Sequence, residues 1–289
     1  MVLMKSGDQP NSAALFEATA VALQALMLPF GIKPREIKTA GVGRTRPVVL
    51  IHGYGSNRSC MLPLEVYLRA VGFDRIFPFN FGSGGAAEGI EPVAMRLRDF
   101  TEGVFDACGG RGTVDLIAHS LGGLAARVYL QEYGGARRVD QCLTISTPHQ
   151  GTYSSYWAPT TVGRQMRPGS DFLARLNDPA RRAPGVRFFS LWAEMDLMVL
   201  PRENSIYSEG DDACIRGAGH SGILIHPETM KLVANRLRAG QGMASTRIER
   251  IAQVGRGIFR KGLSAITARW AKTRSRKSVT QLSDDLGKS

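Results

Sequence analysis

A serine set among small residues, between an apolar run and a helical pattern, constrains the fold of this chain more than any other feature. The segment is Ala118-His119-Ser120-Leu121-Gly122, with TVDLI before it and GLAARVYLQEYG after it. A sharp turn from strand to helix crowds the positions two before and two after its central residue, so only small residues fit there. Such a turn lifts the hydroxyl of Ser120 above the strand end and aims a helix N-terminus at the same point. Ser120 is therefore the candidate nucleophile; the alternative is a serine that only caps an ordinary helix.

The rest of the chain alternates apolar runs with helical patterns. Strands that alternate with helices indicate an α/β fold with a mostly parallel sheet, covered by helices on both faces. The crossovers between its strands should be right-handed. The expected strands are 47–53, 74–80, 113–120, 139–147, 186–194 and a short one at 213–217; the expected helices are 61–72, 91–108, 121–134 and 227–240.

A glycine-bearing loop, HGYG, follows the first expected strand. Such a loop can turn a backbone N–H toward the nucleophile. We therefore expect the N–H groups of Tyr54 and Leu121 to form an oxyanion hole, Leu121 being the residue after the serine. We also expect His52, Gly53 and His119, which belong to these two motifs, to bind substrate.

A base and an orienting acid should follow the nucleophile in the chain order serine, acid, histidine. Asp196 comes just after the expected strand 186–194, and His220 lies in GAGHSG just before the last helix. Both are loop positions at strand ends, where this kind of sheet delivers functional groups. An imidazole with Nε2 on Ser120 and Nδ1–H on Asp196 would take the proton as the serine attacks.

Other histidines and acids compete for these roles. His149 comes too early in the chain, and His226, which precedes a proline, is more typical of a helix start. His220 is the remaining candidate base. For the acid, Glu203, Asp211 and Asp212 stay open as surface charges or as substitutes for Asp196.

At these residues the sequence resembles bacterial triacylglycerol lipases and esterases of the α/β-hydrolase superfamily. The similar segments are VLIHGYGSNRS, VDLIAHSLGGLAARVYL, STPHQGT, GRQMRPGS and GAGHSGIL, in the family's order between residues 46 and 238. The resemblance implies an α/β-hydrolase fold, the triad Ser120, Asp196 and His220, the oxyanion donors Tyr54 and Leu121, and no cofactor. It departs from the family pattern where Ala118 replaces a glycine, and it implies hydrolysis of medium or long acyl esters.

Residues 151–185 interrupt the alternation between two late strands. Insertions of this length are more often functional covers than idle loops. We expect a cap here, and hypothesise that its aromatic and apolar side chains form a movable cover. No metal site is expected, because Cys60, Cys108, Cys142 and Cys214 stand far apart without zinc-ligand spacing.

The two ends of the chain differ from its middle. An apolar stretch at 13–32, interrupted by Glu17 and Gln24, predicts a helix that packs on the domain or lies on a bilayer. Residues 241–289 hold eleven basic residues against three acidic ones, a net +8 of the chain's +12. Apolar residues recur there every three or four positions, which predicts a basic amphipathic helix that meets an anionic membrane or docks on the domain; its end should be disordered. Nucleic-acid binding is disfavoured, because no aromatic residues alternate with its basic cluster.

The expected division is therefore an N-terminal helix and connector (1–45), an α/β-hydrolase domain (46–240) with its cap, and the basic tail (241–289). The expected function is serine-dependent hydrolysis of carboxylic esters, of lipid type, with an acyl-enzyme on Ser120. The alternatives are an acyltransferase or phospholipase with the same triad, and a non-catalytic membrane-binding module. A cytoplasmic or peripheral membrane location is favoured over secretion, since no cleavage site follows the apolar stretch.

Overall fold

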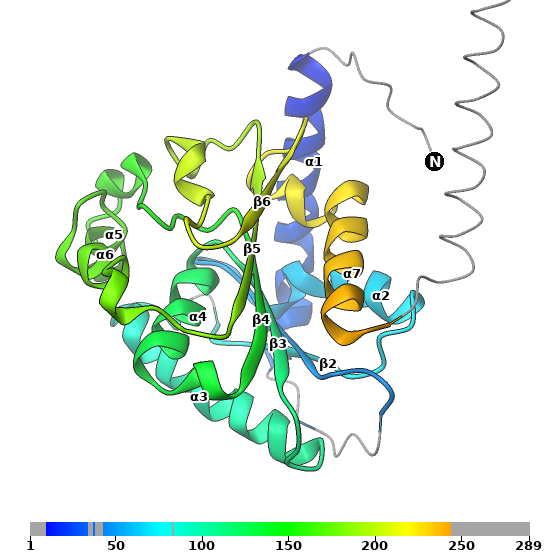
Figure 1. Ribbon diagram of the computed structural model, residues 1–289. Coiled ribbons are helices and arrows are strands. Elements are labelled where there is room, and N and C mark those ends of the chain that lie inside the picture. The colour runs from blue at the N-terminus through cyan, green and yellow to red at the C-terminus, as the bar shows by residue number, and fades with distance from the viewer. Residues whose placement is uncertain (1–9, 34–36, 38–42, 83, 244–289) are drawn as a thin grey trace, which may run out of the picture. The chain divides into compact units, whose positions relative to one another are not determined.

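The computed structural model has an open sheet of parallel strands at its centre (Figure 1). It describes residues 10–33, 37, 43–82 and 84–243. Within them the strand order is β2-β1-β3-β4-β5-β6, and every neighbouring pair is parallel, which confirms the predicted α/β architecture. The strands are β1 (Val48–Ile51), β2 (Ile76–Phe79), β3 (Val114–His119), β4 (Val139–Ile145), β5 (Arg187–Ala193) and β6 (Asp211–Ile215).

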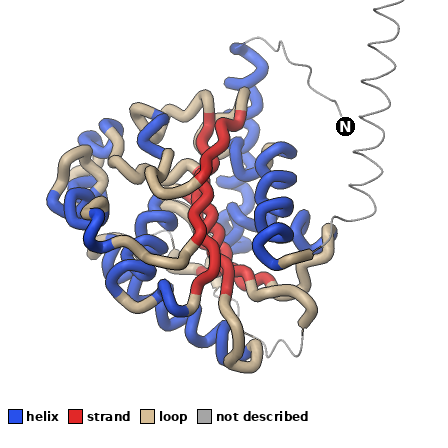
Figure 2. Tube along the Cα trace, in the orientation of Figure 1, coloured by secondary structure: helices blue, strands red, loops and turns tan. Residues whose placement is uncertain are grey.

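Helices cover both faces of this sheet, as Figures 1 and 2 show. Helices α3 and α4 lie on one face, and α1, α2 and α7 lie on the other. The α-helices are α1 (Pro10–Met27), α2 (Leu62–Ala70), α3 (Ile90–Ala107), α4 (Leu121–Glu132), α5 (Thr161–Gln165), α6 (Asp171–Leu176) and α7 (Pro227–Gln241). The short 3₁₀ helices are η1 (Leu28–Gly31), η2 (Arg58–Met61), η3 (Gly135–Arg137), η4 (Tyr153–Trp157), η5 (Pro179–Arg181), η6 (Arg202–Ser205) and η7 (Gly222–Leu224).

The central strands are apolar because they are covered on both sides. Every residue of β1 and of β3 is buried, as expected for parallel strands between two helical layers. The exception in sequence is Asp115 of β3, whose buried carboxylate pairs with Arg46 at 2.9 Å. A buried charge of this kind requires a partner, and the pair lies at the amino end of the strand, away from the carboxyl edge.

The carboxyl ends of the strands bring the predicted functional segments to one edge of the sheet. The HGYG loop follows β1, Ser120 follows β3, Asp196 lies three residues after β5, and His220 follows β6. Since β3 lies between β1 and β4 in the sheet, Ser120 stands near the middle of this edge. Ligands of open α/β sheets bind at this edge, so the topology alone gathers these residues.

The predicted insertion lies between β4 and β5 and has two different halves. Helices α5 and α6 belong to the main hydrophobic core, which includes the buried side chains of Val162, Phe172 and Leu176. The 3₁₀ helix η4 instead exposes its aromatic side chains, with Trp157 at 89% exposed. Helices α5 and α6 therefore pack in the core, whereas η4 presents its side chains to solvent. The movable cover stays a prediction.

The N-terminal helix α1 packs on the same compact unit, which comprises residues 1–242. It contacts η2 and η7, and Ala20 on its inner side is buried. Among the described residues, the segment Ser12–Gly31 is long and apolar enough to cross a membrane by length and composition, with only 6% of the tested window buried. The predicted basic tail lies outside the described residues from 244 onward, so its helix and the proposed boundary near 240 stay predictions.

Candidate active site

Ser120 occupies a strained turn between β3 and α4. Its φ is 53° and its ψ is −127°, a combination that residues with a side chain rarely adopt. A conformation of this cost persists only where the surrounding structure holds it. Here the N–H of Ser120 donates to the carbonyl of Ile145 at 2.8 Å, which ties the turn to the end of β4.

The small residues around Ser120 are required by close backbone approaches. A Cβ on Gly122 would lie 2.5 Å from the carbonyl oxygen of His52, and one on Gly123 would lie 2.0 Å from the hydroxyl of Thr147. Both distances are far shorter than any real contact, so a side chain at either position would push α4 away from the sheet. Ala118 is fully buried in β3, which shows why a residue no larger than alanine stands there.

The structure brings Ser120, His220 and Asp196 into one hydrogen-bonded chain. His220 Nε2 lies 3.1 Å from Ser120 Oγ, and His220 Nδ1 lies 2.9 Å from Asp196 Oδ2. Because an ionised carboxylate only accepts hydrogen bonds, Nδ1 carries the proton and Nε2 accepts from the serine hydroxyl. This tautomer is the one that a base acting on Ser120 needs.

Asp196 is held as a buried carboxylate. Burial by itself would raise its pKa, but the hydrogen bonds from His220 and from the N–H groups of Val199 and Met198 outweigh this and lower it. Those two N–H groups donate to Asp196 Oδ1 at 2.9 Å and 2.8 Å. Oδ1 is therefore occupied by the backbone, and Oδ2 is left to orient His220.

The two predicted oxyanion donors lie on either side of the nucleophile. Leu121 is the first residue of α4, where backbone N–H groups have no acceptor inside the helix. Tyr54 follows Gly53, whose missing Cβ would lie 3.0 Å from Ser120 Cβ, so this loop runs directly against the serine. This arrangement suits two backbone N–H groups that would donate hydrogen bonds to a negatively charged oxygen. Their role as an oxyanion hole stays a prediction.

His52 and His119 are used inside the protein. His52 donates from Nδ1 to the carbonyl of Gly53 at 2.9 Å and accepts from the N–H of Phe81 at 3.2 Å. His119 donates from Nε2 to the carbonyl of His220 at 3.0 Å. Burial lowers the pKa of His52 to about 4 and that of His119 to about 3, so both are neutral near pH 7. These contacts give both imidazoles a supporting task; direct substrate contact by them and by Gly53 stays a prediction.

The competing acids lie elsewhere. Glu203 is exposed in η6. Asp211 and Asp212 start β6 at the opposite edge of the sheet, where Asp211 pairs with Arg236 and Asp212 accepts from the indole of Trp192. From that edge, neither Asp211 nor Asp212 can reach the loop that carries His220. Of the two alternatives left open by the sequence, surface charge or substitute for Asp196, they fit the first.

The competing histidines also have structural partners. His226 caps α7 by accepting the N–H of Glu228 at 3.3 Å, as its place before a proline predicted. His149 is buried between the hydroxyl of Thr144 and the guanidinium of Arg127, and burial lowers its pKa well below the usual value. Sequence reasoning missed this fully buried Arg127, which also donates to the carbonyl of Leu176 and so holds the end of α6.

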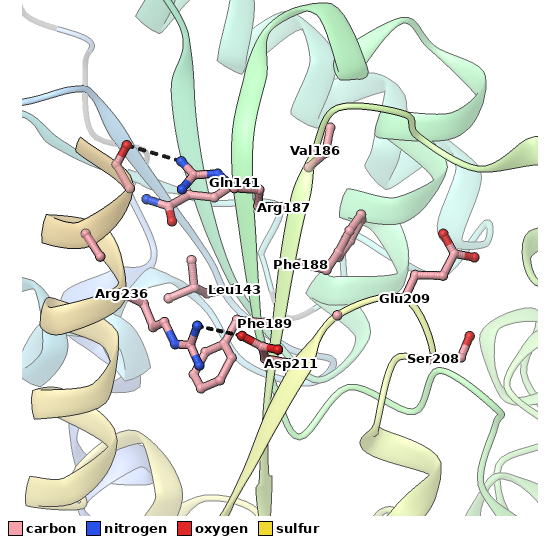
Figure 3. A pocket seen from close by; sticks show the side chains of 13 residues that line it. Gln141, Leu143, Val186, Arg187, Phe188, Phe189, Ser208, Glu209, Asp211 and Arg236 are labelled. Atoms are coloured by element: carbon pink, nitrogen blue, oxygen red, sulfur yellow. Dashed lines mark hydrogen bonds and ion pairs between the residues drawn. The ribbon is translucent and has the colours of Figure 1, made fainter. Parts of the chain in front are cut away.

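An open cavity of about 570 Å³ lies away from this chain of side chains (Figure 3). It is formed by the first residues of β5 and β6 and by the end of α7. Figure 3 shows that its lining side chains stand on both sides of β5, with Phe189 on the α7 side and Phe188 on the other. None of the triad residues lines it, so it is a groove around the amino edge of the sheet and not the reaction site.

Exposed apolar side chains gather on two loops beside Asp196. Leu197 and Met198 follow it directly, and η4 lies next to them because Thr152 and Ser154 both donate to the carbonyl of Met198. We call these exposed side chains the apolar rim: Tyr153, Tyr156, Trp157, Met195, Leu197, Met198 and Leu200.

No group of three or more histidine, cysteine, aspartate or glutamate side chains with the geometry of a metal site occurs among residues 10–33, 37, 43–82 and 84–243.

Comparison with known proteins gives the fold a family setting. Residues 47–176 match the model of the palmitoyl protein thioesterase family. The mature form of the Bacillus licheniformis lipase BlEst2 superposes with a TM-score of 0.58 at 15% identity, over 71% of this chain and 94% of that one. Aspergillus fumigatus lipase B gives 0.58 at 16% identity, over 73% and 56% of the two chains. Paleococcus ferrophilus monoacylglycerol lipase gives 0.51 at 16% identity, over 68% and 96%.

These identities are low, so the superpositions speak for the fold, and the family match adds the segment that carries Ser120. The resemblance predicted from the sequence is confirmed at this level. The chain has the α/β-hydrolase fold, and its residues 47–176 are similar to the palmitoyl protein thioesterase family.

Proposed function

We propose that this protein hydrolyses carboxylic esters of medium or long acyl chains through an acyl-enzyme on Ser120. The observation that carries the proposal is the hydrogen-bonded chain Ser120–His220–Asp196, with links of 3.1 Å and 2.9 Å, on a strained turn that leaves Ser120 only partly buried. The same geometry is what acyl transfer by a serine requires: a nucleophile, a base within reach, and an acid that fixes the base.

The reaction has two halves. In the first, Ser120 Oγ attacks the acyl carbon while its proton moves to His220 Nε2; the tetrahedral intermediate then expels the alcohol, which takes that proton from His220. In the second, water attacks the acyl-enzyme, His220 accepts the water's proton, and the acid leaves as Ser120 recovers it. Asp196 stays ionised throughout and stabilises the imidazolium, which agrees with its lowered pKa.

The negative oxygen of each tetrahedral intermediate would be bound by the N–H groups of Tyr54 and Leu121. The loss of one such donor typically costs about a hundredfold or more in rate. Gly53 supports this assignment, since its lack of a side chain lets the loop approach Ser120. The buried imidazole of His52 also restrains this loop, through its hydrogen bond to the carbonyl of Gly53.

An acyl chain fits the surroundings of the serine better than a polar group does. The apolar rim lies on the loops that follow Asp196 and precede α5, and its exposed side chains would gain from contact with hydrocarbon. The likeness to lipases and to a monoacylglycerol lipase supports the same substrate class.

A lipid surface is the proposed setting of the reaction. Helix α1 and the short η1 after it present Leu15, Val21, Leu26 and Phe30, each at least half exposed, while the other side of α1 packs on the domain. A helix with one apolar side free of protein contacts suits peripheral attachment to a bilayer. The tail predicted from the sequence to be basic and amphipathic would add attraction to anionic lipids.

Acyl thioesters are a second candidate substrate. The match to the palmitoyl protein thioesterase family favours them, and the two half-reactions are unchanged except that a thiol leaves in place of an alcohol. The acyltransferase and phospholipase alternatives use the same acyl-enzyme. Adding an alcohol as acceptor and measuring transfer against hydrolysis separates an acyltransferase from the hydrolases.

The test is a chain-length series of p-nitrophenyl esters, with oxygen and sulfur analogues, assayed on the full chain with and without anionic vesicles. We expect kcat/KM to rise from acetyl toward medium or long acyl groups, to rise further with vesicles, and to vanish in Ser120→Ala. Hydrolysis by Ser120→Ala at the rate of the unsubstituted protein would refute the proposal.

A further inference from the structure

The loop that carries the candidate base is held from outside by a carboxylate of α1. Glu17 Oε1 accepts the N–H of Ser221, and Glu17 Oε2 accepts the N–H of Gly222, both at 2.7 Å. These are the two residues that follow His220, although they stand 204 and 205 positions away from Glu17 in the sequence. A bidentate, charge-assisted pair of this length is among the stronger hydrogen bonds in proteins.

The sequence of the loop is shaped to admit that carboxylate. A Cβ on Gly219 would lie 2.5 Å from both Cδ and Oε2 of Glu17, and a Cβ on Gly222 would lie 2.7 Å from Oε2. Glycines therefore stand on both sides of His220 where the Glu17 side chain enters. The three atoms nearest to a Cβ on Gly219 all belong to Glu17, so this glycine makes room for that side chain above all.

Further contacts fix α1 against the same loop. The Gln24 amide donates to the carbonyl of Ser221 at 3.3 Å, and the ring of Phe16 meets His226 edge-on at 5.8 Å between centroids. The helix thus touches the segment between β6 and α7 at several points, and Glu17 is the one with charge.

From the inside, the loop is held by the sheet. His119 Nε2–H donates to the carbonyl of His220 at 3.0 Å, and the N–H of Met195 donates to the carbonyl of Ala218 at 2.9 Å. These bonds restrain the backbone before and at His220, whereas the Glu17 carboxylate restrains the backbone directly after it. The imidazole therefore projects from a loop that is clamped on both of its sides.

We propose that Glu17 is a positioning residue for His220, and that α1 is in this way part of the active site as well as a candidate membrane contact. The inference rests on the proposed function, because it assumes that His220 is the base. Glu17 does not touch substrate; it acts by holding the loop so that Nε2 stays within reach of Ser120 Oγ. Misplacement of a catalytic group by about 1 Å can lower the rate by about a hundredfold.

The first test compares Glu17→Ala, Glu17→Gln and Glu228→Gln in the full chain, with a short water-soluble p-nitrophenyl ester. Glu228 is an exposed residue at the start of α7, so its change to glutamine removes the same charge without touching the loop. We expect kcat to fall by about ten- to a hundredfold in Glu17→Ala with KM unchanged, by less in Glu17→Gln, which keeps one acceptor oxygen, and not at all in Glu228→Gln. Rates are measured well below the melting temperature of each variant.

The second test is a double-mutant cycle with Gly219→Ala. The added methyl should expel the Glu17 carboxylate and lower kcat in the otherwise unchanged chain, yet have little further effect in the Glu17→Ala background, where its steric partner is gone. This non-additivity is not expected of a residue that merely stabilises the fold.

A Glu17→Ala variant with unchanged kcat overturns the inference, whether or not its melting temperature falls. So does a Gly219→Ala change that costs the same in both backgrounds. These outcomes differ from failure of the proposed function, in which the unsubstituted protein itself would hydrolyse no ester.

Discussion

Two serines follow neighbouring strands at the same edge of the sheet, and their contrast shows what distinguishes the proposed nucleophile from a structural serine. Ser120 follows β3 with φ 53°, and Ser146 follows β4 with φ 45°; within the described residues they are the non-glycine positions with positive φ. Ser120 Oγ meets His220. The Ser146 hydroxyl is buried, and no partner for it occurs in the described part of the chain. Backbone strain alone therefore does not identify a reactive serine; the base and the access to substrate do.

The two turns also differ in the segments that come after them. After Ser120 the chain enters α4 at once, so the N-terminus of this helix lies directly at the serine. After Ser146 the chain runs through a loop whose His149 is buried against Thr144 and Arg127. The first turn is thus the one that suits the proposed chemistry, whereas the second leads into packing contacts within the protein.

The largest expected difference between the two serines is in activity. Ser120→Ala should lower kcat for ester hydrolysis by at least about 10⁴-fold, whereas Ser146→Ala should leave it within about twofold. Both variants should keep the fold, as judged by circular dichroism. Equal losses in the two variants would end the contrast.

The next largest effect concerns the orientation of His220. Asp196→Asn should lower kcat by about 10³- to 10⁴-fold, because an amide nitrogen facing Nδ1 favours the wrong tautomer. Asp211→Asn, an equal change at the other edge of the sheet, should have no effect on kcat. Activity in Asp196→Asn close to that of the control would show that another acid orients the base.

Acid sensitivity of the fold should come from the neutral imidazoles beside the turns. Folding lowers the pKa of His52 to about 4 and of His119 to about 3, so below their unfolded value of 6.5 the unfolded chain binds more protons. Stability is therefore fully present above pH 6.5 and is lost as the pH falls toward 4. From pH 7.5 to pH 5 these two imidazoles should contribute a drop of about 4 kcal/mol in the free energy of unfolding, to which the buried His149 adds.

Urea unfolding across that window measures the drop. His52→Gln should reduce that drop by about 2 kcal/mol, since it removes one of the buried titrating groups. A free energy of unfolding that stays constant from pH 7.5 to 5 would contradict the buried, neutral state of both rings.

The smallest expected effect is on stability at the second turn. Ser146→Gly should stabilise the fold by about 1 kcal/mol, because glycine adopts positive φ without strain and the change removes a buried hydroxyl without a partner. Ser120→Gly should also stabilise, but at the loss of activity. If Ser146→Gly destabilises the fold by a similar amount, its turn is held by the hydroxyl after all.

Much of the fold and of the site could be predicted because the signals are local. Buried parallel strands are short apolar runs. The turn at Ser120 requires small neighbouring residues, which are visible in the sequence as Ala118, Gly122 and Gly123. His220 followed from chain order and from the small number of histidines. The sequence favoured Asp196 as the acid but left Asp211 open. The structure separates them, because Asp196 follows the carboxyl end of β5 whereas Asp211 begins β6.

Two features could not be predicted because their partners are distant in sequence. In the sequence, Glu17 only interrupts an apolar helical stretch. No neighbouring residue indicates that its carboxylate accepts hydrogen bonds from Ser221 and Gly222. Likewise, the insertion between β4 and β5 has weak periodicity, and a distant residue, the buried Arg127 of α4, holds the end of α6 in its packed half.

The central claim is tested most directly by trapping the acyl-enzyme. A p-nitrophenyl acyl ester is added to the full chain, the reaction is quenched in acid, and the modified peptide is identified by mass spectrometry. The account predicts one acyl group on Ser120, formed far more slowly in His220→Ala. An acyl group on Ser146 or on another residue, or turnover with no covalent intermediate on Ser120, would contradict it.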